Sequence, residues 1–123
     1  MPCRWRQSQG FGLSVVGVDS TGLVDPDDVR RAIRPDTILI SIVQANNEVG
    51  TIQPLAEISR IARQAGIPLH TDAAQAVGKI RTRVDELGVD LLSLAGYKFG
   101  RFNTQEELNQ AAAEVVSAVG KAG

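Results

Sequence analysis

The segment "TILISIV" at residues 37–43 decides the fold class, because it is an almost unbroken run of apolar residues. Such a run is typical of a strand covered on both faces, as the strands of parallel sheets usually are. Three further segments are predicted to be strands: "FGLSVVGV" (11–18), "IPLHT" (67–71) and "DLLSLAG" (90–96). We therefore expect a sheet of four strands.

Predicted helices alternate with these strands. In "STGLVDPDDVRRAI" (20–33), Asp25 is placed to cap a short helix that begins at Pro26. A second helix is predicted over 54–66, where a proline opens the segment, a glycine closes it, and apolar residues form one stripe. A third is predicted over 104–120, opened by a capping box. Strands that alternate with helices predict an α/β fold, a parallel sheet with flanking helices.

The composition excludes several classes of function. The chain has 123 residues and a net charge of −1, so it has no basic surface that would indicate nucleic-acid binding. No apolar run approaches the roughly 18 residues of a membrane helix. The single cysteine, Cys3, excludes an internal disulfide and fits a reducing compartment, so we expect a cytoplasmic protein. No metal-binding cluster is predicted.

Polar residues follow the predicted strands at their carboxyl ends. Asn47 follows the second strand, Asp72 ends the third, and Lys98 follows the fourth. Ligands of α/β proteins bind at this edge of the sheet. A lysine there can carry an aldehyde, and an aspartate can pair with a protonated ring nitrogen, a combination that suggests pyridoxal 5'-phosphate (PLP). The same residue types also suit sugar or nucleotide binding.

Three segments carry a more specific resemblance: "ANNEVGTIQPLAEI" (45–58), "HTDAAQAVGK" (70–79) and "VDLLSLAGYKFG" (89–100). They resemble the central part of the cysteine desulfurase and selenocysteine lyase family, PLP-dependent enzymes of the class V aminotransferase type. The resemblance runs without gaps over about residues 22–100. The spacing agrees as well, since Lys98 lies 26 positions after Asp72 (98 − 72).

The resemblance implies roles for individual residues. Lys98 matches the catalytic lysine that carries the cofactor's aldehyde, and Asp72 matches the partner of the pyridine nitrogen. Gln75 matches the side chain that contacts the phenolic oxygen, and Asn47 resembles its companion. Tyr97 stands where the family often has a phosphate-binding histidine, and its hydroxyl can still donate a hydrogen bond.

The resemblance also predicts how the chain is organised. Residues 1–100 resemble part of the PLP-binding large domain of an aspartate aminotransferase-like fold. Residues 101–123 resemble the C-terminal helix of the family's small domain. We therefore expect a protein truncated at its N-terminus and internally deleted after about Gly100. The deleted stretch is the one that carries the acceptor cysteine and the substrate-binding arginine in the family.

Three functions remain open on these grounds. By resemblance the first is removal of sulfur or selenium from cysteine or selenocysteine to give alanine, a reaction that this fragment is not expected to catalyse alone. The second is a non-catalytic interaction protein that forms a homodimer or pairs with a full-length subunit. The third, a generic binding domain for phosphorylated ligands, is weak because no G-x-G-x-x-G or P-loop motif is present.

Two other polar residues are predicted to be structural. His70 lies near the end of a strand, and the family's cofactor-stacking histidine belongs to a part of the sequence that is missing here. Asn46 is expected to form a turn.

Overall fold

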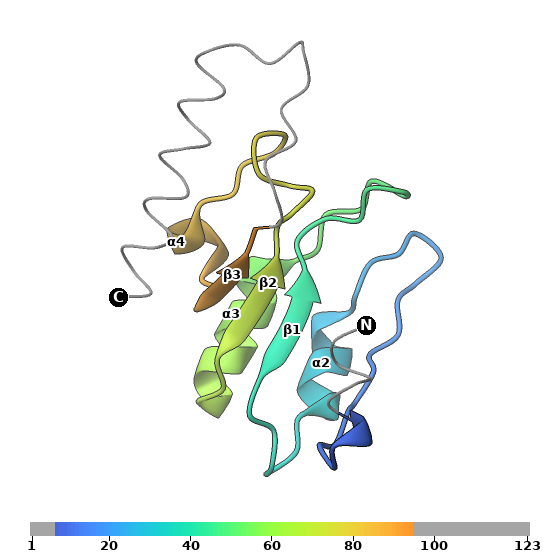
Figure 1. The fold of residues 1–123 in the computed structure, drawn as a ribbon, viewed down its shortest axis with the longest axis vertical. Helices are drawn as coiled ribbons and strands as arrows, with labels where there is room; N and C mark the ends of the chain where they lie inside the picture. Colours follow the sequence, from blue (N-terminus) through green and yellow to red (C-terminus); the bar gives the residue numbers. More distant parts are fainter. Residues whose placement is uncertain (1–6, 95–123) are drawn as a thin grey trace.

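The computed structural model describes residues 7–94, which form one small sheet with helices packed against it (Figure 1). The predicted helix over 104–120 lies outside these residues. The strands are β1 (Ile40–Val43), β2 (Leu69–Asp72) and β3 (Leu91–Ser93), and the helices are α2 (Pro26–Ala32), α3 (Leu55–Ala65) and α4 (Val84–Leu87).

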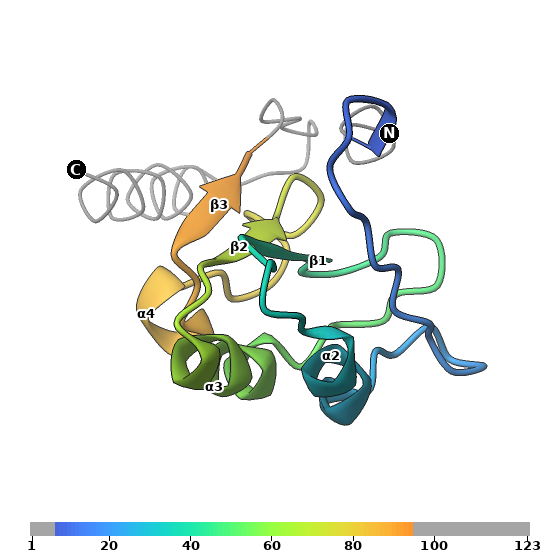
Figure 2. The same ribbon diagram turned by 90° about the horizontal axis from the view of Figure 1, so that it is seen from below.

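The sheet is parallel, with the strand order β1-β2-β3. Its register places Ile42 beside Thr71 and Thr71 beside Leu92. Helices α2, α3 and α4 all lie on the same side of the sheet (Figure 2). Right-handed crossovers produce this arrangement when successive strands are added in one direction. The predicted α/β class with a parallel sheet is confirmed.

The helix ends follow the predicted chemistry. The Oδ1 atom of Asp25 accepts a hydrogen bond of 2.8 Å from the N–H of Asp27, and Pro26 is the first residue of α2. Helix α3 ends at Gly66, whose φ of 67° lies in the left-handed region that glycine adopts without strain. Local sequence signals therefore determine where α2 begins and where α3 ends.

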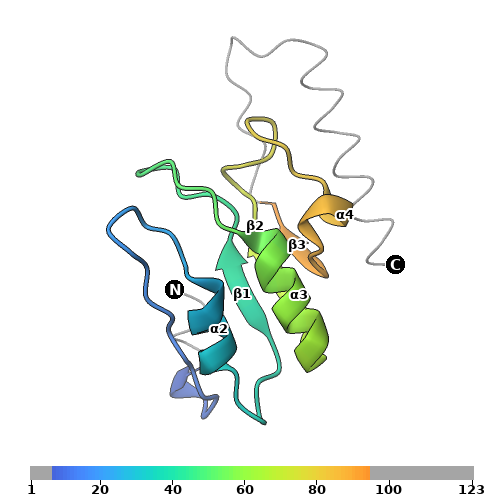
Figure 3. The same ribbon diagram turned by 180° about the vertical axis from the view of Figure 1, so that it is seen from behind.

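The hydrophobic core lies between the helices and the side of the sheet that they cover. Figure 3 shows α3 crossing directly over the strands. Leu55 and Ile58 of α3 and Leu69 of β2 are at most 1% exposed. The cluster is completed by Val24, Val29, Ile40, Ala62, Ile67 and Val89. Side chains alternate between the two faces along β2, so every second side chain of this strand points to the helices and contributes to the core.

The prediction of a strand over residues 11–18 is wrong. These residues form neither helix nor strand, and Val15 and Val18 are 83% and 58% exposed. A β-branched run favours an extended backbone, but a strand also needs a neighbour for its hydrogen bonds. Both neighbours of β2 are occupied, and no strand of the described part pairs with the free edge of β1. The structure therefore describes three strands rather than four.

The expectation that residues 37–43 are covered on both faces is also wrong for the described part of the chain. Strand β1 begins only at Ile40, and Ile38 and Leu39 before it are exposed. Within β1 itself, Val43 on the side away from the helices is 40% exposed. Helices of residues 7–94 thus cover only one face of the sheet, which we call the helix-covered face; the other is the open face.

Candidate functional site

The carboxyl ends of the three strands meet at one edge of the sheet. Val43, Asp72 and Ser93 are paired in register there. The carbonyl oxygen of Asp72 accepts a hydrogen bond of 2.9 Å from the N–H of Gln44, and that of Ser93 accepts one of 3.0 Å from the N–H of Ala73. These bonds hold the first residues beyond the strands close together.

Asp72 occupies the centre of this edge, because it ends the middle strand. Its side chain is exposed, and its Oδ1 atom accepts a hydrogen bond of 2.9 Å from the N–H of Ala74. Within residues 7–94, no protein group is bonded to its other carboxylate oxygen. The backbone therefore orients the carboxylate through one oxygen and leaves the second available to a cationic N–H donor.

Asn47 lies in the loop that follows β1. The loop is closed by an antiparallel bridge between Ala45 and Ile52. Asn46 shapes its turn, because its Oδ1 atom accepts hydrogen bonds from the N–H groups of Glu48 (2.8 Å) and Val49 (3.2 Å). The prediction that Asn46 is a turn residue is confirmed, and the neighbouring Asn47 is exposed.

Gln75 lies in the turn that follows β2, three residues beyond Asp72. The carbonyl oxygen of Ala73 accepts from the N–H groups of Ala76 (2.9 Å) and Val77 (3.1 Å), which winds the chain tightly at this point. The side chain of Gln75 is exposed. Asn47 and Gln75 thus follow adjacent strands at the edge that Asp72 occupies.

Tyr97 and Lys98 lie outside the described residues. The last described residue before them, Leu94, directly follows β3 at the same sheet edge. The roles assigned to Asn47, Asp72, Gln75, Tyr97 and Lys98 from the sequence remain predictions.

Two buried glutamines support the loops at this edge, and neither was among the predicted site residues. Gln44 is 1% exposed; its Nε2 donates to the carbonyl oxygen of Arg81 (3.1 Å), and its Oε1 accepts from the hydroxyl of Thr82 (3.1 Å). Gln53 accepts from the N–H of Val24 (2.9 Å) and donates to the carbonyl oxygen of Gly22 (2.8 Å). The only feature of the sequence that could have pointed to Gln44 is its position directly after an apolar strand.

His70 lies on the open face, one strand position before the buried Thr71. Its Nδ1 atom is 2.8 Å from the hydroxyl oxygen of Ser41 on β1, and its Nε2 atom is 2.8 Å from that of Ser93 on β3. The prediction that His70 is structural agrees with this placement.

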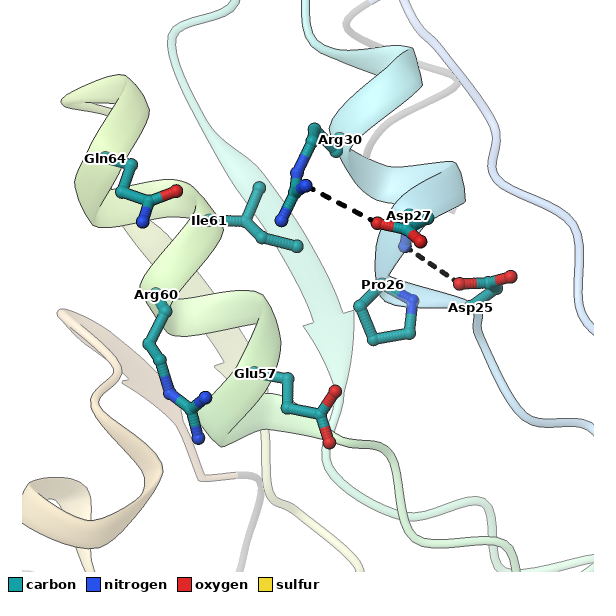
Figure 4. A pocket seen from close by; sticks show the side chains of 8 residues that line it. All are labelled: Asp25, Pro26, Asp27, Arg30, Glu57, Arg60, Ile61 and Gln64. Atoms are coloured by element: carbon teal, nitrogen blue, oxygen red, sulfur yellow. Dashed lines mark hydrogen bonds and ion pairs between the residues drawn. The ribbon is translucent and has the colours of Figure 1, made fainter.

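A surface hollow of about 310 Å³ lies between α2 and α3 (Figure 4). Charged side chains of both signs line it, and Arg30 pairs with Asp27 at 3.6 Å. Its lining residues are Asp25, Pro26, Asp27, Arg30, Glu57, Arg60, Ile61 and Gln64. None of the predicted site residues lies among them, so the hollow is separate from the strand-end site.

A sequence model of the family described as aminotransferase class-V matches residues 3–100. The chain belongs to this family. Members of the class V aminotransferase family, cysteine desulfurases included, depend on PLP. The confirmed match explains why "HTDAAQAVGK" and "VDLLSLAGYKFG" resemble desulfurase segments so specifically.

Relatives of the class V family include "Cysteine desulfurase IscS" of Dictyoglomus turgidum, which is 55% identical over 98 residues. The aligned region is 80% of this chain but 25% of that relative. "Cysteine desulfurase, mitochondrial" of Candida maltosa is 50% identical over 95 residues, or 77% of this chain and 20% of the relative. The chain therefore spans about a quarter of the length of the relatives it matches.

A solved structure titled "SspA in complex with cysteine" is similar with a TM-score of 0.75 and 42% sequence identity. The similarity covers 79% of this chain and 28% of that one. The three-stranded sheet thus corresponds to part of a larger class V fold.

The described residues fit the family's cofactor in their chemistry. A carboxylate with a free oxygen suits a protonated pyridine nitrogen, and exposed amides on the adjacent loops suit the phenolic oxygen. Among residues 7–94, no three His, Cys, Asp or Glu side chains cluster as a metal site would require. None of the helices in this range has both the length and the hydrophobicity of a membrane-spanning segment.

Proposed function

We propose that this chain is a PLP-binding fragment of the cysteine desulfurase type. The observation that carries the proposal is the geometry of Asp72, which ends the middle strand with one carboxylate oxygen bonded to the Ala74 N–H and the other without a partner among residues 7–94. The relatives named cysteine desulfurase and the family match over residues 3–100 support the same interpretation.

Each site residue has a distinct task in this proposal. Asp72 would keep the pyridine nitrogen protonated through its free oxygen, and Asn47 and Gln75 would donate hydrogen bonds to the phenolic oxygen. The Tyr97 hydroxyl would hold the phosphate, and the Lys98 amine would bind the cofactor covalently through its aldehyde. When bound, PLP supplies an electron sink for chemistry at the α-carbon of an amino acid.

Catalysis by these 123 residues alone is not part of the proposal. The substrate class of the intact machinery would be cysteine or selenocysteine, and a cysteine side chain would accept the chalcogen. The one cysteine of this sequence, Cys3, does not match that acceptor. With cysteine and PLP we therefore expect no release of alanine or sulfide above a protein-free control; turnover abolished by Lys98→Ala would contradict this.

Intact mass after incubation with PLP and borohydride reduction tests cofactor binding. We expect a gain of one pyridoxyl group in the wild type and none in Lys98→Ala. Lys79→Ala is the matched control, because Lys79 is an exposed lysine in the turn after β2. Equal gain in wild type and Lys98→Ala, or no gain in either, would refute a specific site.

The open face of the sheet favours a second candidate, an interaction protein. On this face Val43 and Leu91 are 40% and 47% exposed, and each outer strand has one edge without a partner in the described part. Exposed strand edges and apolar side chains suit pairing with another copy or with a full-length class V subunit. Co-purification with such a subunit would support this function, and a chain that stays monomeric in its presence would refute it.

The proposed location is the cytoplasm, where a single unpaired cysteine is ordinarily kept reduced. A mitochondrial location is the alternative, because several similar relatives, that of Candida maltosa among them, carry that description. Fractionation of cells that express the chain distinguishes the two.

A further inference from the structure

The imidazole of His70 connects all three strands across the open face. His70 belongs to the middle strand, and its two ring nitrogens lie 2.8 Å from hydroxyl oxygens on the two outer strands, Ser41 on β1 and Ser93 on β3. We call this set of three side chains the imidazole bridge. Each serine hydroxyl can donate or accept, so a neutral ring satisfies both bonds in either tautomer.

Histidine suits this position for a geometric reason. Neighbouring strands lie about 4.8 Å apart, so one side chain must reach in opposite directions to contact both neighbours. The imidazole ring is rigid and carries its two nitrogens on different sides. An amide such as Asn is shorter and could preserve at most part of the bridge.

The bridge lies beside the residues that the proposed site uses. Side chains alternate along a strand, so His70 and Asp72 project from the same face of β2. Ser93 is the register partner of Asp72, and it precedes Lys98 by five positions (98 − 93). The bridge therefore ties the strand that carries Asp72 to the strand that leads to Lys98.

We propose that His70 is a positioning residue, which holds the ends of the strands at the separation at which Asp72 can contact the pyridine nitrogen of PLP. This inference rests on the proposed function. The adjacent backbone bond from Ala73 N–H to the Ser93 carbonyl oxygen joins the same two strands, and the bridge adds a side-chain constraint on the cofactor side. Loss of the bridge lets the strand ends move apart without unfolding the helix-covered core.

The first experiment observes the bridge itself, without cofactor. His70 is the only histidine in the chain, so nitrogen-15 NMR of the imidazole reports on one ring. We expect a ring N–H that exchanges slowly with water in the wild type, and faster exchange in Ser41→Ala and in Ser93→Ala. Ser14→Ala, at an exposed serine in the segment before α2 that is neither helix nor strand, is the control and leaves the signal unchanged.

The second experiment measures the dissociation constant of PLP by titration, with borohydride capture on Lys98 as the end point. One lost hydrogen bond corresponds to a change of about fivefold, so we expect about that increase for each serine variant and more for His70→Leu. His70→Asn, which can keep one bond, should fall between His70→Leu and wild type.

A purely structural role for His70 is distinguished by Val29→Ala. This change removes buried apolar contacts of α2, away from the strand ends, and leaves the bridge intact, so at temperatures where all variants are folded its PLP dissociation constant should equal the wild-type value. An unchanged constant in His70→Leu would overturn the positioning role. Imidazole exchange that is unchanged by both serine substitutions would overturn the bridge and with it the positioning role, but not the proposed function. Failure of the wild type to capture PLP would overturn the proposed function and this role together.

Discussion

The two faces of the sheet are made from alternate residues of the same strands, yet they differ in kind. In β2, Leu69 and Thr71 are fully buried under the helices, while His70 and Asp72 between and after them belong to the open face. The helix-covered face is an apolar core, and the open face carries a hydrogen-bonded bridge and the proposed cofactor partner. The comparison indicates that stability is concentrated on one face and chemistry on the other.

The largest expected difference in stability is between two variants that each replace one leucine by alanine, one on each face of the sheet. Leu69→Ala leaves a cavity at a fully buried position, and we expect a loss of about 2–5 kcal/mol in the free energy of unfolding. Leu91→Ala on β3, at a side chain 47% exposed, should cost about 1 kcal/mol or less. Denaturant titration measures both. Equal losses would show that the open face is covered in solution.

A smaller effect is expected from a buried polar group on the core side. Gln53→Ala leaves the Val24 N–H and the Gly22 carbonyl oxygen without their partner, which should cost about 1–3 kcal/mol. Gln64→Ala, at an exposed position of α3, should stay within about 0.5 kcal/mol of wild type. Similar values for the two glutamines in denaturant titration would mean that the Gln53 bonds contribute nothing net.

The smallest expected effect on the free energy of unfolding comes from Asp19, in a solvent-exposed turn that belongs to neither face of the sheet. The pKa of Asp19 is lowered from its ordinary value of 3.8, chiefly because the Thr21 hydroxyl donates to its carboxylate and also because backbone N–H groups do so. The folded-state pKa lies below the unfolded value, so this contribution is present above the unfolded pKa and is lost as pH falls through the folded pKa.

Comparison of wild type with Asp19→Asn tests this pH dependence. The wild-type advantage in the free energy of unfolding should shrink as the pH falls from above the unfolded-state pKa of 3.8 through the lower folded-state pKa. An advantage that grows on acidification would contradict the direction of the pKa shift.

Local signals in the sequence predicted much of the fold. The cap at Asp25 and the glycine stop at Gly66 were predicted and confirmed, since both depend on a few neighbouring residues. The strand over 11–18 was predicted in the same way and is wrong. Strand formation also depends on a partner strand, which local propensity does not report.

The proposed site was predictable to a similar degree. Parallel strands end at one edge, so the sequence pattern was sufficient to place Asn47 and Asp72 near it, whereas Gln75 was singled out only by the resemblance. The roles of Tyr97 and Lys98 remain predictions from the resemblance. The buried glutamines were not predicted, because their partners lie 29 to 38 positions away in the chain.

The sequence by itself determined the class of the fold, the start of α2, the end of α3 and the family, because these follow from periodicity, capping residues and motifs of contiguous residues. Only the tertiary structure decided which face of the sheet is covered and that His70 joins Ser41 and Ser93, which lie 29 and 23 positions from it. The physical reason is that strand register brings distant residues together, and register is set by packing of the whole sheet against its helices.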